Sequence, residues 1–382
     1  MKPQASATPK IAKPRRRDSM KDTSSCVILR EPGKIEIGEF PIPPIGDDDG
    51  LLEIEMAGIC HTDYELYRGT HGAAFPVILG HELVGRIAAL GEKAATRWGV
   101  NVGDRVTVEA IVRCGFCTAC IRGQYKHCRE IKVYGTYTSC DEPPHLWGSF
   151  SQFTYLAPGA VVHKVPDGMS PELATLSCVA VANGLGWGVT QGGIGIGDAV
   201  VVQGVGPIGL SGIAAAREAG ASLIIATGRE ADGERLALAT EFGADVIVNV
   251  DAEDVKAAVS RATGGELAHV VLDTTGSPQA IAVSTTLVRP TGTVVNGGLT
   301  GDSTLTPLAL DALLRPEVRL QHVFTYDYDA VRRAMAVINT GKYPFERLIT
   351  HRFPMSAAEE AIKVVGRETP SPGVIKTVLV PD

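Results

Sequence analysis

Residues 199–219 read AVVVQGVGPIGLSGIAAAREA and decide the fold of a large part of this chain. An uncharged run over 199–203 leads into the pattern G-x-G-x-x-G and then into a helical pattern over 208–219. Between a strand and a helix, such glycines let the backbone turn tightly and approach a pyrophosphate, and the helix N-terminus presents free N–H groups to the anion. The stretch therefore predicts a dinucleotide-binding loop made of Gly204, Gly206, Pro207, Ile208 and Gly209.

Apolar runs alternate with helical patterns on both sides of this loop, from about residue 180 to 323. Because strand–helix–strand repetition is typical of a parallel, doubly wound sheet, we expect a Rossmann α/β domain over residues 180–324. The elements expected in and after it are strands at 199–203, 223–226, 246–249, 348–353 and 375–379, and helices at 208–219, 234–242, 328–339 and 357–365.

The end of the second strand bears on which nicotinamide cofactor is used. NAD sites place a carboxylate there to bind the adenosine ribose, whereas NADP sites remove that charge and offer a cation to the 2′-phosphate. The strand here ends in Thr227-Gly228-Arg229, without an acid. This favours NADP(H), with Gly228 and Arg229 in the site, although the adjacent Glu230 keeps NAD(H) open.

The remainder of the chain has a different texture. From residue 26 to about 165, short apolar alternations are interrupted by Gly, Pro or Asp every eight to twelve residues, which is typical of a β-rich domain, a barrel or a sandwich. The first 25 residues are basic, contain three prolines and lack apolar periodicity, so we expect a disordered tail rather than a secretory signal. The basic cluster at 13–17 is either a targeting or nucleic-acid patch or a solvated extension.

Size and charge narrow the class of function. A chain of 382 residues exceeds one hydrophobic core, so two domains are expected. The net charge of −7 argues against a nucleic-acid partner or binding to a membrane surface, and it favours a small-molecule substrate or ligand. The uncharged stretch 199–216 is long enough to span a bilayer, but Gln203, Pro207 and its glycines favour a buried strand and loop.

Four of the eight cysteines stand in a C-x2-C-x2-C-x7-C run: Cys114, Cys117, Cys120 and Cys128. Four soft sulfurs at this reach can surround one zinc ion, which predicts a closed, structural metal site. An iron–sulfur cluster and two disulfides are the alternatives. The other cysteines lie far apart without the framework of a small secreted protein, which indicates a reducing, cytoplasmic compartment.

Cys60, His81 and Cys178 are further candidate metal ligands, although each alone is also explained as an ordinary buried residue. Their surroundings carry a resemblance. Residues 80–85, GHELVG, followed by Gly91, resemble the signature of the zinc-containing alcohol dehydrogenases of the medium-chain dehydrogenase/reductase family. Other motifs occur in the same order and spacing as in that family: C-H-T-D at 60–63, the cysteine run, the loop at 204–209 and D-T-T-G at 273–276. The resemblance therefore covers about residues 26–380.

The resemblance implies a GroES-like catalytic domain made of residues 26–179 and 325–382, with a structural zinc lobe. It also implies a catalytic zinc on Cys60, His81 and Cys178 with one position open, Glu172 being the fallback for Cys178. The further roles that it implies are as follows: Asp63 orients the zinc histidine, Glu82 lies behind the metal or becomes a ligand, Thr62 bonds the substrate oxygen and starts a proton relay, His61 contacts the pyrophosphate, and Glu65 replaces the usual relay histidine.

The expected activity is hydride transfer between an alcohol and a ketone or aldehyde, with NADP(H) preferred. An NAD-dependent polyol, amino-alcohol or terpenoid-alcohol dehydrogenase is the alternative, and Ala110 leaves room for a substrate bulkier than ethanol. The resemblance also implies a homodimer or homotetramer. Two hypotheses from other functional classes remain: a non-catalytic or zinc-free relative, and a zinc-ribbon protein that binds nucleic acid.

Overall fold

A computed structural model describes residues 22–301 and 304–382. Six parallel strands form the doubly wound sheet that the sequence predicts, in the order β13-β12-β11-β14-β15-β16. The order reverses between β11 and β14, which is where such sheets open a crevice for a dinucleotide. The strands are β11 (Ala199–Gln203), β12 (Leu223–Gly228), β13 (Val246–Asn249), β14 (Ala268–Asp273), β15 (Val288–Asn296) and β16 (Arg319–His322).

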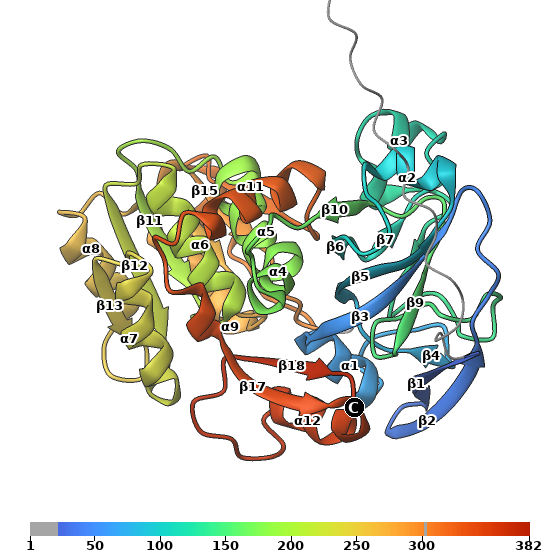
Figure 1. Ribbon diagram of the computed structural model, residues 1–382. Coiled ribbons are helices and arrows are strands. Elements are labelled where there is room, and N and C mark those ends of the chain that lie inside the picture. The colour runs from blue at the N-terminus through green and yellow to red at the C-terminus, as the bar shows by residue number, and fades with distance from the viewer. Residues whose placement is uncertain (1–21, 302–303) are drawn as a thin grey trace, which may run out of the picture.

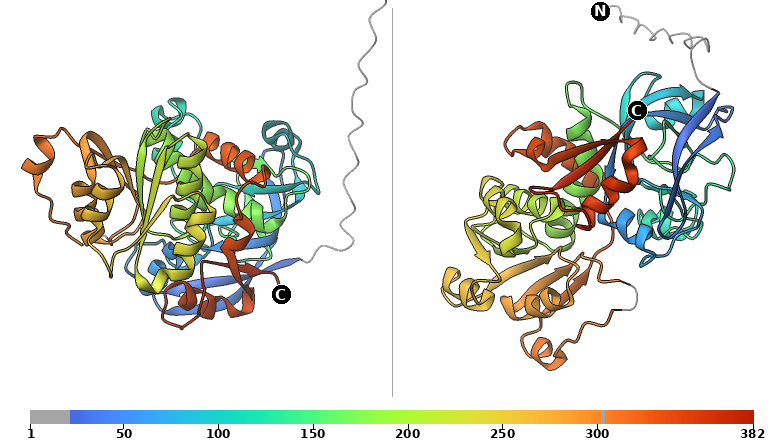
Figure 2. Two further views of the ribbon diagram at one scale, coloured as in Figure 1. Left: turned by 90° about the vertical axis from the view of Figure 1, so that its left-hand side faces the viewer. Right: turned by 90° about the horizontal axis from the view of Figure 1, so that it is seen from below.

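Helices cover both faces of this sheet (Figure 2). Because side chains alternate along a strand, Val200 and Val202 of β11 pack into the core with Leu210, whereas Val201 packs on the opposite face with Val259. The helices are α6 (Pro207–Glu218), α7 (Gly233–Glu241), α8 (Val255–Ala262), α9 (Pro278–Leu287), α10 (Leu310–Leu314) and α11 (Tyr328–Asn339), with a 3-10 turn η4 (Glu230–Asp232).

The rest of the described chain is β-rich and is built from both ends of the sequence. Figure 1 shows the C-terminal strands beside the N-terminal ones: β18 pairs with β3 antiparallel and with β17 parallel. The largest sheet has the order β10-β6-β5-β3-β18-β17, with β9 also on β3. Its strands are β3 (Gly50–Ile59), β5 (Glu82–Leu90), β6 (Arg105–Val108), β9 (Phe153–Leu156), β10 (Val162–Lys164), β17 (Ile349–Pro354) and β18 (Lys376–Val380).

Smaller elements complete this part. They are the sheet β2-β1-β4 with β1 (Thr23–Glu31), β2 (Lys34–Pro41) and β4 (Val77–Ile78), the pair β7 (Ile111–Val112) and β8 (Lys132–Val133), the helices α1 (His61–Arg68), α2 (Glu92–Trp98), α3 (Thr118–Ile121) and α12 (Ala358–Val365), and the 3-10 turns η1 (Tyr125–His127), η5 (Phe345–Leu348) and η6 (Met355–Ala357).

The expected tail of residues 1–25 is wrong at its C-terminal end. Thr23 begins β1 and pairs with Pro41, and the buried Ser24 Oγ accepts a hydrogen bond from Phe153 N at 3.0 Å. This long-range pairing leaves no local periodicity, so the sequence pattern did not reveal it. Residues 1–21 lie outside the described part of the chain.

A single helical segment, Pro171–Gln191, links the two parts and consists of α4 (Pro171–Leu176), a π-helical turn η2 (Ser177–Val181), α5 (Ala182–Leu185) and a second π-helical turn η3 (Gly186–Gln191). It is apolar and long enough to cross a membrane, but 83% of its most apolar window is buried within the protein. It is therefore a core helix.

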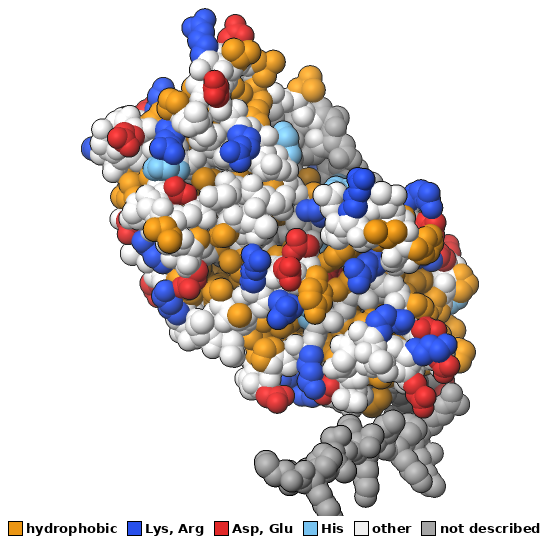
Figure 3. All heavy atoms as spheres, turned by 90° about the horizontal axis from the view of Figure 1, so that it is seen from above, with side chains coloured by type: hydrophobic (Ala, Val, Ile, Leu, Met, Phe, Trp, Pro, Cys, Tyr) orange, Lys and Arg blue, Asp and Glu red, His pale blue; other side chains and the backbone are white. Residues whose placement is uncertain are grey.

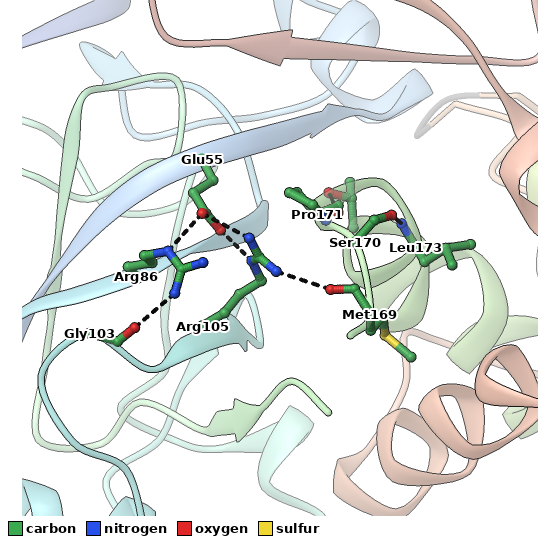
Figure 4. Close-up of polar contacts among 9 residues, drawn as sticks. Glu55, Arg86, Gly103, Arg105, Met169, Ser170, Pro171 and Leu173 are labelled. Atoms are coloured by element: carbon green, nitrogen blue, oxygen red, sulfur yellow. Dashed lines mark hydrogen bonds and ion pairs between the residues drawn. The ribbon is translucent and has the colours of Figure 1, made fainter. Parts of the chain in front are cut away.

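The start of this linking helix is tied to the large sheet (Figure 4). Glu55 of β3 accepts hydrogen bonds from Arg86 at 2.9 Å and from Arg105 at 2.5 Å, and Arg105 also donates to the carbonyl of Met169 at 3.0 Å. Ser170 then caps α4 by accepting from Leu173 N at 3.3 Å. The helix that carries Cys178 thus begins at a fixed point on the sheet.

Acidic and basic side chains are interspersed on the face shown in Figure 3. Where both signs alternate in this way, their fields largely cancel beyond a Debye length of about 8 Å. This face, in its described residues, offers no broad field of one sign to a polyanion.

Candidate active site

Three potential metal ligands lie together beside β3 and β5. Cys60 follows β3 and caps α1, His81 immediately precedes β5, and Glu82 begins it. The Sγ of Cys60, a ring nitrogen of His81 and a carboxylate oxygen of Glu82 all lie within 4.8 Å of one another. His81 and Glu82 are buried, whereas Cys60 is half-buried, so the cluster is open on the cysteine side.

Asp63 supports both Cys60 and His81, as the resemblance implies. Its Oδ2 accepts from the backbone N–H of Cys60 at 2.8 Å, and its Oδ1 lies 3.4 Å from His81 Nδ1. The second contact is an ion-pair distance whose geometry falls short of a hydrogen bond. Burial disfavours protonation of His81, but the charges of Asp63 and Cys60 prevail and raise the pKa of its imidazole well above the usual value. With Nδ1 facing Asp63, Nε2 is the nitrogen available to a metal.

Glu82 is held by Lys376, a residue that the sequence analysis missed. Lys376 Nζ lies 2.5 Å from Glu82 Oε1 and donates to the carbonyl of Ile59 at 2.9 Å. Strand β3 lies between β18, which carries Lys376, and β5, which carries Glu82. Gly58 of β3 leaves room for the pair, because a Cβ at this position would lie only 2.0 Å from Glu82 Oε2. A lone charged residue in the apolar run 375–380 was the available signal for Lys376.

Three buried atoms in this cluster lack a hydrogen-bond partner among the described residues: Asp63 Oδ1, His81 Nδ1 and Glu82 Oε2. Asp63 Oδ1 and His81 Nδ1 face each other at 3.4 Å, which leaves Glu82 Oε2 as the buried oxygen without a neighbour of this kind. An unpaired buried polar atom is costly unless an ion or a water molecule binds it. One sulfur, one imidazole nitrogen and one carboxylate oxygen form a donor set that suits zinc, with a fourth position free. The residues therefore fit the catalytic zinc that the sequence predicts.

The structure differs from the prediction at the third ligand, because Cys178 does not join this group. Its Sγ lies 3.2 Å from Thr107 Oγ1 and 3.9 Å from the carbonyl oxygen of Val108, inside the core that surrounds the linking helix. Burial raises the pKa of this thiol. Cys178 stands in the π-helical turn η2 of the linking helix.

Glu172, the fallback for Cys178, is also outside the group, since its carboxylate pairs with Arg352 at 2.8 Å.

The other predicted residues of this segment lie along α1. Thr62 Oγ1 is 3.7 Å from Cys60 Sγ, so its hydroxyl borders the cluster. His61 is exposed and its ring lies 5.5 Å from that of Tyr64. Glu65 is half-buried one turn along the helix. The structure thus brings Thr62 to the metal cluster and leaves His61 accessible to a cofactor phosphate.

The four-cysteine lobe contains a second set of potential ligands. All four sulfurs lie within 4.8 Å of one another, with Sγ–Sγ distances of 3.5 Å from Cys117 to Cys120 and 3.9 Å from Cys117 to Cys128. A zinc tetrahedron with Zn–S bonds of about 2.3 Å has edges of about 3.8 Å. All eight cysteines of the chain are free thiols, so the two-disulfide alternative does not fit. Backbone N–H groups of Arg129 and Cys120 lower the pKa of the Cys117 thiol to about 6, which favours a thiolate ligand.

The phosphate-binding loop has the form that the sequence predicts. Gly204 has a φ of +91°, and a Cβ on Gly209 would lie 1.9 Å from the carbonyl oxygen of Gly204. A Cβ on Gly206 would meet nothing within 4 Å, so the outer side of the loop is open. The helix α6 begins at Pro207, directly after Gly206. The loop therefore fits a pyrophosphate at the helix N-terminus.

The tip of β12 has no acid, as predicted, and Arg229 follows Gly228 with its side chain 60% exposed. Glu230 is engaged elsewhere: its carboxylate accepts from the side chain of Asn249, and its N–H donates to Asp251 at 2.9 Å. Both contacts direct this acid toward the end of β13.

A cavity of about 550 Å³ lies between the cysteine lobe and the segment that includes the end of β16 and the residues after it. Its wall includes Tyr326, a residue that the sequence analysis missed, whose hydroxyl accepts a hydrogen bond from Ala110 N at 3.2 Å. Most of its other lining side chains are polar: Gln124, Lys126, His127, Gln191, Gln321, His322 and Asp327.

Comparison with known proteins places this geometry in context. A model of the alcohol dehydrogenase GroES-like domain matches residues 46–167, and a model of the zinc-binding dehydrogenase domain matches residues 207–340. A Mycobacterium tuberculosis protein named "Probable alcohol dehydrogenase" is 39% identical, covering 93% of this chain and 98% of its own length. The erythritol/L-threitol dehydrogenase of Mycolicibacterium smegmatis is 32% identical, covering 93% and 97%.

Solved structures match over similar lengths. A zinc-binding dehydrogenase homologue from Sinorhizobium meliloti, bound to NADP, is 27% identical with a TM-score of 0.83 and coverage of 94% of this chain and 100% of its own. An alcohol dehydrogenase from Escherichia coli CFT073, complexed with NADH, is 25% identical with a TM-score of 0.80 and the same coverage. Relatives of this fold therefore hold either cofactor.

Proposed function

This chain belongs to the zinc-containing alcohol dehydrogenases of the medium-chain dehydrogenase/reductase family, and from that premise we propose that it transfers hydride between a polar alcohol and NADP(H). It is a zinc-binding oxidoreductase that acts on alcohols with a nicotinamide cofactor. The preference for NADP(H) and the class of alcohol are the proposal.

The tip of β12 carries the cofactor preference. An NAD site needs a carboxylate that accepts from the ribose hydroxyls, and Gly228 cannot supply one. Arg229 offers a cation instead, and Glu230 is bound to Asn249 and Asp251. Since a 2′-phosphate carries negative charge, this arrangement favours NADP(H) over NAD(H).

When bound, zinc supplies a Lewis acid that polarises the substrate oxygen, and the nicotinamide ring exchanges the hydride. We assign the zinc ligands to Cys60, His81 and Glu82, with Asp63 fixing the imidazole. Lys376 holds the Oε1 of Glu82, which leaves Oε2 as the carboxylate oxygen that would be free to bind the metal.

We propose that Thr62 holds the proton of the substrate hydroxyl, because its Oγ1 borders the cluster. Glu65, half-buried one turn later on α1, stands where the proton leaves toward solvent. The relay therefore ends in a carboxylate here, in place of the usual histidine.

We propose that the cavity lined by Tyr326 receives the substrate, and its polar side chains then favour a hydroxylated one. Its side chains offer several hydrogen-bond donors and acceptors, whereas a pocket for a terpenoid alcohol would be apolar. Tyr326 connects the cavity to Ala110, the position expected to border the substrate. Among the relatives, the erythritol/L-threitol dehydrogenase is named for such a polyol.

We propose a homodimer or homotetramer that works in a reducing, cytoplasmic compartment. Leu305, Leu310 and Leu314 are 90%, 69% and 72% exposed near the edge strand β16, which is a poor surface for an isolated chain. Eight free thiols suit a reducing compartment.

The test is a panel of polyols, secondary alcohols, amino alcohols and terpenoid alcohols assayed with both NADP⁺ and NAD⁺. The proposal expects the highest kcat/KM for a polyhydroxy alcohol with NADP⁺. A kcat/KM at least as high with NAD⁺ would refute the cofactor preference, and a preference for apolar alcohols would refute the substrate class.

A further inference from the structure

Three arginines from two parts of the chain converge on one carboxylate beside the tip of β12. Asp232 Oδ1 lies 2.9 Å from Arg367 Nη2 and 3.9 Å from Arg235 Nη1, and Asp232 Oδ2 lies 3.8 Å from Arg229 Nε. Arg229, Asp232 and Arg235 follow β12, whereas Arg367 comes from the segment between α12 and β18. The single carboxylate cannot neutralise three guanidinium groups.

Asp232, Arg235 and Arg367 border a second cavity of about 550 Å³, which begins at Glu230, directly after Arg229. One wall is residues 230–235, and the opposite wall is the segment after α12, including Arg367 and Ser371. In a Rossmann fold, the adenosine ribose lies at the tip of the second strand. The cavity therefore extends from the place where the 2′-hydroxyl or 2′-phosphate of the cofactor is bound.

Arg235 is not free to bind a ligand, because its guanidinium donates to the carbonyl of Val374 at 3.1 Å and only 17% of its side chain is exposed. Arg229 and Arg367 are 60% and 43% exposed. Arg367 borders the cavity and Arg229 directly precedes Glu230 on its wall, so these two arginines are the ones available to a ligand there. Burial lowers the pKa of Arg235, and the charge of Arg367 lowers it further, as expected where positive charge is in excess.

Two other acids border the cavity and have to be considered. Glu230 is held by Asn249, as described above. Glu234 lies against the facing segment, since a Cβ on Gly373 would be 2.7 Å from its Oε2. Asp232 is thus the acid that contacts the free arginines, and a phosphate would compete with it for them.

The backbone of Arg367 is strained. It has a φ of +60° directly after Gly366, the C-cap of α12, and this left-handed position favours glycine. Non-glycine residues in this conformation cost free energy and cluster at ligand-binding sites.

Building on the proposed NADP(H) preference, we propose that Arg367, from the catalytic part of the chain, binds the 2′-phosphate of NADP(H) together with Arg229. Arg367 is then a specificity residue that Rossmann sequence patterns do not report, because it follows β12 by more than 130 residues and meets it only in the fold. Asp232 holds Arg367 in place until the phosphate arrives.

The test compares binding of adenosine 2′,5′-bisphosphate and adenosine 5′-monophosphate to the zinc-loaded protein by calorimetry, so that hydride transfer is not involved. The two ligands differ only in the 2′-phosphate. In Arg367→Gln, the affinity for the bisphosphate should fall by about tenfold or more, with the affinity for the monophosphate within about twofold of the wild type. Asp232→Asn should bind the bisphosphate more tightly than the wild type.

Two further variants make the result decisive. Arg347→Gln is the matched control. Arg347 also joins the catalytic part to the nucleotide domain, through an ion pair with Glu241 on α7, but it does not border the cavity. Its affinities for the bisphosphate and for the monophosphate should be unchanged. Arg367→Gly relieves the left-handed strain, so it should melt no lower than the wild type and still lose affinity for the bisphosphate.

Bisphosphate affinity retained in both Arg367 variants, or equal losses for the two ligands, would overturn the role of Arg367 alone. A wild type that binds the two ligands equally would overturn the NADP(H) preference itself, and the role of Arg367 with it.

Discussion

Lys376 and Glu82 form a buried ion pair across β3, with Nζ and Oε1 2.5 Å apart and Gly58 running between their strands. The two residues are almost 300 positions apart in the sequence, and the pair fixes one oxygen of the carboxylate that we assign to zinc. This contact connects the stability of the large sheet to the geometry of the metal cluster.

Replacing Lys376 with methionine should therefore destabilise the protein strongly. The change leaves the Glu82 charge buried without its partner, for which a loss of about 3–5 kcal/mol in the free energy of unfolding is typical. Urea unfolding of the variant and of Lys342→Met measures it; Lys342 pairs with Glu218 on the surface, and its loss should cost about 1 kcal/mol or less. Equal losses of unfolding free energy in the two variants would show that the buried Lys376–Glu82 pair stabilises the fold no more than a surface ion pair does.

Substitution of Glu82 and of Cys178 separates the two candidate ligand sets. Because Glu82 lies in the cluster and Cys178 bonds Thr107, Cys178→Ser should retain two zinc ions per chain, and Glu82→Gln should lose part of the catalytic zinc. Zinc content after dialysis against a mild chelator measures both. The reverse pattern would restore the ligand set that the sequence resemblance implied.

The Glu55 cluster predicts a specific dependence of stability on pH. Partial burial opposes ionisation, but Arg105 and Arg86 prevail and hold the pKa of the Glu55 carboxyl below its ordinary value of 4.5. An acid with a lowered folded-state pKa stabilises the fold above its unfolded-state pKa, and this contribution is lost as the pH falls through the folded-state pKa.

Glu55→Gln should accordingly cost about 1 kcal/mol at neutral pH, and the difference from the wild type should vanish at a pH below the lowered folded-state pKa of Glu55. Urea unfolding at both pH values tests this, with the exposed Glu53→Gln on the same strand as the control. A cost that is the same at both pH values would contradict the assigned role of the ion pairs.

Much of this architecture follows from local patterns. The strands 199–203 and 246–249 and the helix 328–339 have the predicted bounds, because apolar periodicity and a flanking Asp or Gly define them locally. The strand predicted at 223–226 continues to Gly228, since ladder pairing with Asn249 extends it. The order of the motifs sufficed to predict the fold class and the zinc lobe.

The remaining features depend on contacts between distant segments. Three features have no local sequence signal: the contact of Cys178 with Thr107, the pairing of Thr23 with Pro41 and the ion pair of Arg367 with Asp232. Lys376 is a partial exception, because a charge within an apolar strand indicates a buried partner. Sequence patterns here predict the kind of site, and the fold selects which residues form it.

Metal content tests the central claim most directly. The wild-type protein should contain two zinc ions per chain, one in the lobe and one on Cys60, His81 and Glu82. Cys60→Ser should retain one zinc, lose hydride transfer and keep a cooperative unfolding transition, because the lobe site is untouched. A single zinc in the wild type, or two in Cys60→Ser with activity retained, would contradict the account.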